Sequence, residues 1–224
     1  MNELTKGTSV VIAARLRAGD ESAYAELADQ RLVEREGRLE LDVGDLTPRA
    51  ADRILELAGD RAADPVQLNL AEQGRAAFGG INLGAWLDWP GLKRFRRLNL
   101  TVGFRGKKAL EALGKSPNLS PEITYLDLHS CDIGAAGCGL LAKTKAFASL
   151  EELGLDAGDQ DRTRWTSACL DRLFPKKGGV LTRLARLSVR GWDLTPADVT
   201  PLVVAGRAPA LRTVQLTRQS LSLT

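Results

Sequence analysis

The chemistry that this sequence could carry centres on its single histidine, His129. Ser130 and Cys131 follow it directly, and a histidine beside a hydroxyl or thiol is the pairing that nucleophilic catalysis uses. However, neighbouring residues of a short strand alternate between its two faces, and this alternation places Cys131 on the buried side. We therefore predict a surface or binding role for His129, and we predict that the chain is not an enzyme.

Two other patterns of potentially reactive residues fail on their spacing. A phosphate-binding loop needs a glycine five positions before its Gly-Lys pair. That position holds Thr101 before Gly106 and Ala109 before Gly114. The three cysteines have no metal-like spacing, and one histidine cannot complete a site with them. The sequence therefore predicts no bound metal and no cofactor.

The strongest charge feature is a basic run at residues 93–97, followed by Arg105, Lys107 and Lys108. Such a cluster could bind phosphate groups, so nucleic-acid binding is kept as the third-ranked alternative. Phe95 inside the run is expected to fill the core, and the whole chain has a formal net charge of only +3. No run approaches the roughly 18 apolar residues that a membrane helix needs. We therefore expect neither nucleic acid nor a membrane as the partner.

The strands that should position these residues are marked by a short apolar motif. This motif occurs seven times, at intervals of 27 to 34 residues. Each copy holds two aliphatic residues separated by one position, which is the period of a short strand. The pairs are Leu39 and Leu41, Leu68 and Leu70, Leu98 and Leu100, Leu126 and Leu128, Leu153 and Leu155, Leu187 and Val189, and Val214 and Leu216. A repeat of this length is typical of a solenoid.

Between these strands the sequence has helical character. At residues 47–59, Thr47 is a typical N-cap, Pro48 suits the first helical position and Gly59 ends the segment. Thr195 and Pro196 repeat the pattern near the end of the chain. Strand followed by helix, repeated, predicts an α/β solenoid with a curved parallel sheet on the concave face and helices on the convex face.

Residues 1–35 lack the motif, and we predict that they form an N-terminal helical cap over the first repeat. Its main helix is expected at residues 20–33, because Tyr24, Leu27, Ala28 and Leu32 follow helical spacing. Residues 36–224 then form a solenoid of about seven repeats. No closing helix follows the seventh strand. The last residues are therefore expected either to fold back as a minimal cap or to leave an edge for self-association.

The span 36–224 resembles leucine-rich-repeat proteins, and its period resembles the ribonuclease-inhibitor-like subclass. The best match has Ile123, Leu126, Leu128, Cys131 and Ile133 in the expected positions. Cys131 occupies the ninth position, where the family usually has an asparagine or cysteine that bonds the loop backbone from inside. Most other repeats depart there. The resemblance implies a module that binds other proteins or, as the alternative, a non-catalytic regulator of a partner enzyme, such as a GTPase-activating-protein-like factor.

The residues between and beside the motif aliphatics are expected to form one outward, concave strand face. Over the middle repeats this face combines an aromatic residue with charges of both signs, as a protein-binding hot spot does. The candidate partner-binding residues are Arg97, Tyr125, Asp127, His129, Glu152, Asp156, Arg186 and Arg190. A solvated polar face is the competing interpretation for each of them. Trp86 and Trp89 are expected to pack in the core or on the convex side, and Trp165 is a candidate exposed anchor.

We therefore predict a protein-interaction module or scaffold whose partner is another protein. The N-terminus has no signal-peptide pattern, and reduced cysteines suit a cytoplasmic protein. The abundance of Ala, Arg and Gly indicates a high-GC bacterial genome.

Overall fold

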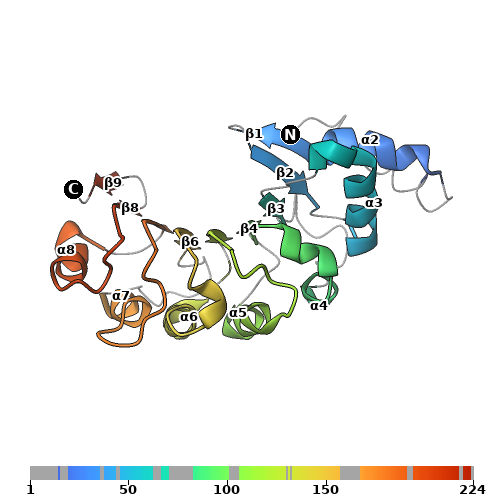
Figure 1. The fold of residues 1–224 in the computed structure, drawn as a ribbon. Helices are drawn as coiled ribbons and strands as arrows, with labels where there is room; N and C mark the ends of the chain where they lie inside the picture. Colours follow the sequence, from blue (N-terminus) through green and yellow to red (C-terminus); the bar gives the residue numbers. More distant parts are fainter. Residues whose placement is uncertain are drawn as a thin grey trace.

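The computed structural model places a sheet above a row of helices (Figure 1). It describes residue 15 and residues 20–35, 38–43, 46–62, 67–70, 83–100, 106–129, 131, 133–156, 167–190, 194–216 and 219–222. Among these, the side chains of residues 61, 62, 156, 190, 196 and 219–222 are not described.

Within the described residues, nine strands form one sheet in chain order. They are β1 (Leu32–Arg35), β2 (Arg38–Asp42), β3 (Gln67–Asn69), β4 (Arg97–Asn99), β5 (Tyr125–Leu128), β6 (Glu152–Asp156), β7 (Arg186–Arg190), β8 (Thr213–Leu216) and β9 (Gln219–Ser222). Strands β2 to β8 pair in parallel, and the two end strands pair antiparallel with their neighbours. The predicted α/β class with a mostly parallel sheet is therefore confirmed.

From β3 to β8 the strand register puts equivalent motif residues side by side, so that Leu98 pairs with Leu68 and Leu126, and Leu126 also pairs with Leu153. All four are buried. Because side chains alternate along a strand, the residues on either side of each leucine point to the opposite face of the sheet.

The predicted register of the first copy was wrong by two residues, because Leu68 pairs with Leu41 and not with Leu39. Leu41 and Val43 are the fully buried residues there, and Leu39 is only partly buried.

The segments between the parallel strands are helical as predicted. The described helices are α2 (Ser22–Arg31), α3 (Pro48–Ala58), α4 (Leu83–Leu87), α5 (Gly106–Lys115), α6 (Gly134–Leu141), α7 (Ser167–Leu173) and α8 (Pro196–Val204), with short 3₁₀ turns η1 (Gly59–Ala62), η2 (Pro90–Arg94) and η3 (Lys145–Phe147). Figure 1 shows α5 to α8 in a row on one side of the sheet, and α6 contacts both α5 and α7.

Local signals in the sequence set the helix ends. The Thr47 side chain accepts a hydrogen bond from the backbone N–H of Ala50 at 3.3 Å, and Gly59 ends α3 with φ of 53°. At α8, the carboxylate of Asp198 accepts from the backbone N–H and the hydroxyl of Thr195, at 2.9 and 2.7 Å. Both N-caps were predicted from the sequence.

The hydrophobic core lies between the sheet and the helices. The predicted core positions of Phe95, Trp86 and Trp89 are confirmed, because all three side chains are buried. The two tryptophan rings meet edge to face with centroids 5.2 Å apart. The indole N–H of Trp89 donates to Asp52 at 2.8 Å, so its one polar atom is satisfied. Trp165 lies outside the described residues.

Strands, and not helices alone, close the two ends of the sheet. Helix α2 ends at Arg31, two residues before the predicted end, and Leu32 begins strand β1. Leu32 pairs with Leu41 and is buried in the sheet rather than on a helix stripe. At the other end, β9 folds back on β8, which is the first of the two predicted outcomes. Self-association through this end stays a prediction.

Candidate functional site

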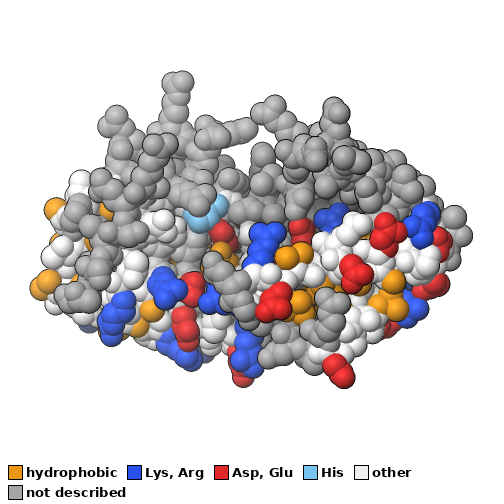
Figure 2. Space-filling model, turned by 90° about the horizontal axis from the view of Figure 1, so that it is seen from above, with side chains coloured by type: hydrophobic (Ala, Val, Ile, Leu, Met, Phe, Trp, Pro, Cys, Tyr) orange, Lys and Arg blue, Asp and Glu red, His pale blue; other side chains and the backbone are white. Residues whose placement is uncertain are grey.

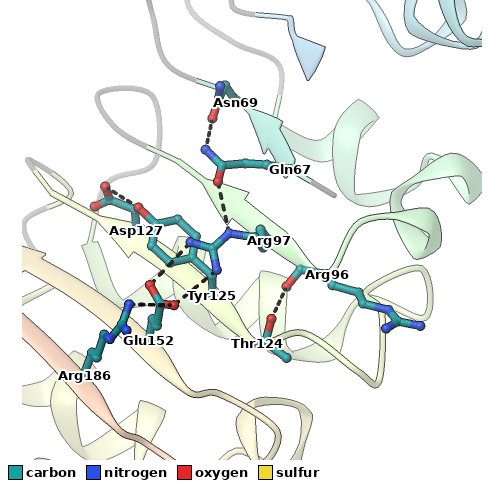
Figure 3. A network of polar contacts seen from close by, with 9 residues as sticks. All are labelled: Gln67, Asn69, Arg96, Arg97, Thr124, Tyr125, Asp127, Glu152 and Arg186. Atoms are coloured by element: carbon teal, nitrogen blue, oxygen red, sulfur yellow. Dashed lines mark hydrogen bonds and ion pairs between the residues drawn. The ribbon is translucent and has the colours of Figure 1, made fainter. Parts of the chain in front are cut away.

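A continuous polar network crosses the outward face of the parallel strands (Figure 3). Each strand contributes the residues that flank its buried leucine, so side chains about 30 residues apart in sequence become neighbours. Strands in a sheet lie only about 4.8 Å apart, which lets long polar side chains reach the next strand.

Arg97 on β4 is the centre of this network. Its Nε donates to Oε1 of Gln67 on β3 at 3.2 Å, and its guanidinium lies 3.9 Å from the centroid of the Tyr125 ring on β5. A terminal nitrogen also pairs with Glu152 on β6 at 3.4 Å. The side chain is only 10% exposed. Arg97 therefore joins four strands through one nearly buried cation.

The network extends from Arg97 in both directions along the sheet. Toward the N-terminal end, Gln67 donates to Asn69 at 2.8 Å, and Asn69 donates to Glu40 on β2 at 3.0 Å. Toward the C-terminal end, Arg186 on β7 lies 3.6 Å from the carboxylate of Glu152. The outward residues of six parallel strands, β2 to β7, are thus linked.

A second group lies beside the network on β5. The Tyr125 hydroxyl donates to Oδ2 of Asp127 at 3.2 Å, and Oδ1 of Asp127 accepts the backbone N–H of His129 at 3.0 Å. The same carboxylate contacts Nδ1 of His129. His129 is buried, and its Nε2 has no hydrogen-bond partner among the described residues. Asp127 therefore fixes the orientation of the imidazole, leaving one buried ring nitrogen unsatisfied.

Gly154 on β6 makes room for this pair. A Cβ built at this position would lie 2.7 Å from Oδ1 of Asp127 and 2.8 Å from Cε1 of His129. Since real Cβ contacts are essentially never this short, the two β5 side chains occupy the space that a side chain at position 154 would need. The glycine is part of the site for this steric reason.

Burial and hydrogen bonding set the ionisation of this group. Burial raises the pKa of Tyr125 far above its ordinary value, and the nearby Asp127 charge raises it further, so the hydroxyl stays a donor. Burial works against ionisation of Asp127 too. There, however, the hydrogen bonds from His129 and Tyr125 outweigh burial and lower the pKa of the carboxyl. Asp127 is therefore ionised near neutral pH.

Acidification below about pH 4 is expected to remove the stabilisation that ionised Asp127 gives, since an unfolded aspartate titrates near ~3.9. A carboxyl whose pKa is lowered by folding stabilises above the unfolded pKa, and this contribution is lost as the pH falls through the folded pKa. Urea unfolding of the wild type and Asp127→Asn, from about pH 7 to about pH 2.5, measures it. The difference in unfolding free energy should shrink at low pH; a constant difference would contradict the assignment.

Six of the eight candidate residues lie in this arrangement: Arg97, Tyr125, Asp127, His129, Glu152 and Arg186. The backbones of Asp156 and Arg190 pair across β6 and β7, and their side chains lie outside the described set. The prediction of an exposed face was wrong for Arg97 and His129, which are both buried. Gln67, Tyr125 and Glu152 surround Arg97 from neighbouring strands, and the linear sequence does not show that they meet it.

Three network residues and one glycine were missed as site residues. Glu40, Gln67 and Asn69 had been placed on the outward face by the repeat register, but nothing in the sequence separated them from ordinary surface residues. Gly154 carries no functional group, and its importance follows only from the two side chains over it.

The described part of the chain shows no assembled nucleophile. The Cys131 thiol is buried, and Sγ lies 3.2 Å from the carbonyl oxygen of Leu100 and 3.5 Å from that of His129. Burial also raises the pKa of the Cys138 thiol, and the neighbouring Cys169 raises it further. No group of three or more potential metal ligands occurs among the described residues.

The basic run at residues 93–97 is divided by the fold. Phe95 is in the core, Arg97 turns into the polar network, and Arg96 pairs with Glu122 at 2.9 Å. Figure 2 likewise shows basic and acidic side chains interspersed over the described surface on the side that it views. Surface charges of mixed sign do not create the continuous positive field that would attract a nucleic-acid backbone.

Comparison with models of known protein families gives no match, and neither does comparison with curated protein sequences. In the described part of the chain, no helix combines the length and the apolar character needed to cross a membrane.

Proposed function

We propose that this chain is a leucine-rich-repeat solenoid that acts as a protein-interaction module, with its concave strand face as the binding surface. The in-order parallel sheet with helices on one side is compatible with the solenoid. The position of the Cys131 thiol against the Leu100 carbonyl supports it as well, because the family's ninth residue bonds the loop backbone from inside.

The observation that carries the proposal is the network on strands β4 to β7. Tyr125 is held between the Arg97 guanidinium and the Asp127 carboxylate, and Glu152 holds two arginines. Side chains fixed in this way lose little conformational freedom when a partner binds. Aromatic and arginine side chains on a rigid surface are also those that contribute most at protein interfaces.

The same residues favour binding over catalysis. The imidazole of His129 is oriented by Asp127, but the neighbouring thiol of Cys131 is buried against backbone carbonyls. We propose a non-catalytic protein with a protein partner, no cofactor, and a cytoplasmic, bacterial setting. Cys131, Cys138 and Cys169 form no disulfide within the described part of the chain, which suits a reducing compartment.

A bulky side chain on the strand face is expected to abolish partner binding, whereas the same side chain on a helix should leave it intact. Ser188→Trp places an indole on the outward face of β7, beside Gly154 of β6. Ala112→Trp adds the same group to the exposed side of α5 and is the matched control. Affinity capture from a lysate of the source cells, quantified by mass spectrometry, compares both with the wild type.

Specific proteins held by the wild type and by Ala112→Trp, and lost with Ser188→Trp, would support the strand face. Loss with Ala112→Trp alone would place binding on the helical side. Capture of no specific protein by the wild type would count against an interaction module. Circular dichroism of each variant verifies that the fold is kept.

A further inference from the structure

Two arginines from strands β4 and β7 contact one carboxylate of β6 on the outward face of the sheet. Glu152 contacts two guanidinium groups, Arg97 at 3.4 Å and Arg186 at 3.6 Å. Figure 3 shows both arginines reaching the same carboxylate from opposite sides. The two arginines therefore share the single carboxylate of Glu152.

The two arginines differ in how fully they are engaged. Arg97 has a partner for Nε, a ring against its plane and Glu152 at its end, and it is 10% exposed. The Arg186 side chain is 66% exposed, and its ion pair with Glu152 is long. A guanidinium has five N–H donors. Arg186 is therefore the less engaged of the two arginines, and its charge is the one open to solvent.

The surroundings of Arg186 do not remove this charge. The nearest outward residues on β7 and β8 are Ser188, Thr213 and Gln215, which are neutral hydrogen-bonding side chains. Two other arginines near this end, among the described side chains, make contacts of their own. Arg183 pairs with Glu151 at 2.9 Å, and Arg212 donates to the carbonyls of Pro209 and Leu211. Arg186 is thus an exposed cation with Glu152 on its β6 side and neutral hydrogen-bonding side chains toward β8.

We infer that Arg186 is the binding point for a carboxylate of an acidic segment in the partner protein. This inference rests on the proposed function and specifies the chemistry of the partner. A planar guanidinium matches a carboxylate with two parallel hydrogen bonds. Ser188, Thr213 and Gln215 can bond the neighbouring peptide groups. A continuous phosphate backbone carries a row of charges and fits less well, because the outward residues next to Arg186 on β7 and β8 are neutral.

Selection from a random displayed-peptide library tests the inference with a defined probe. The purified wild-type chain should enrich peptides rich in Asp and Glu, whereas Arg186→Glu should enrich peptides rich in Lys and Arg. For one selected acidic peptide, fluorescence anisotropy should show binding about tenfold weaker with Arg186→Ala. Arg186→Lys should lose less affinity, because lysine keeps the positive charge and loses only the bidentate hydrogen bonding to the carboxylate. Affinity should also fall as salt is raised.

The outcomes separate the inference from the proposed function on which it rests. Acidic enrichment that is reversed by Arg186→Glu supports both. Peptides that bind without acidic enrichment, ignore Arg186 and are lost with Ser188→Trp would overturn the inference and leave the strand face as the binding surface. Absence of any selected peptide, or binding unaffected by Ser188→Trp, would overturn both. Since Arg186 is largely exposed, thermal unfolding of its variants is expected to match the wild type.

Discussion

Arg97→Ala is expected to lower the free energy of unfolding by about 2–4 kcal/mol. The substitution removes the cation over the Tyr125 ring, the donor to Gln67 and one of the two partners of Glu152. Removing one member of a buried pair leaves the other charge without compensation. Glu152 is 25% exposed and keeps Arg186, so the cost falls below that of a fully buried pair. Urea denaturation followed by circular dichroism measures the change.

Two variants distinguish the network from a general effect of charge. Arg97→Lys keeps the cation but cannot bond Gln67 and Glu152 together, so we expect a smaller loss than with alanine. Arg186→Ala removes the other partner of Glu152 from an exposed position, and we expect a change within about 1 kcal/mol. An equal loss from Arg97→Ala and Arg186→Ala would contradict the central role of Arg97.

Gly154→Ala is expected to destabilise the fold by about 1–3 kcal/mol, because a methyl group must displace well-packed neighbours. The new Cβ would overlap Asp127 and His129, which hold each other in place. The matched control is Gly139→Ala on α6, where a Cβ meets nothing within 4 Å. This control should be neutral or stabilising by about 0.5–1 kcal/mol, since alanine favours a helix over glycine. Thermal or urea unfolding compares the two.

A double substitution identifies the cause of the Gly154 effect. His129→Ala removes the imidazole that lies over the glycine, so Gly154→Ala should cost less in that background. The coupling between the two positions is the difference between the double variant and the sum of the single ones. Additive effects would show that the overlap with His129 is not the source of the destabilisation.

The core and the strand register from β3 to β8 could be predicted from the sequence alone. Leu98, Leu126 and Leu153 recur at nearly equal intervals, and an aliphatic residue two positions later marks each as a strand. All three are buried and lie side by side in the sheet. This prediction succeeds because burial of apolar surface acts on every repeat in the same way. The same spacing of apolar residues therefore recurs along the chain.

The helix starts were accessible for a different physical reason. An N-cap depends on a side chain and a backbone group three residues apart, as at Thr47 with Ala50 and at Thr195 with Asp198. Both partners stand within one short segment of sequence. By contrast, the strand at Leu32 was predicted as helix, because its partner Leu41 lies beyond a reversal of the chain.

The elements that rely on local bonds and on a repeated apolar pattern can thus be predicted from the residues alone. The same holds for the residues that face away from the core, including Arg97, Tyr125 and Glu152. The burial of Arg97 by its neighbours, the need for a glycine at position 154 next to His129, and the exposure of Arg186 follow only from the folded arrangement. These properties depend on contacts between side chains about 30 residues apart, whose reach and pairing are fixed only when the strands lie next to one another.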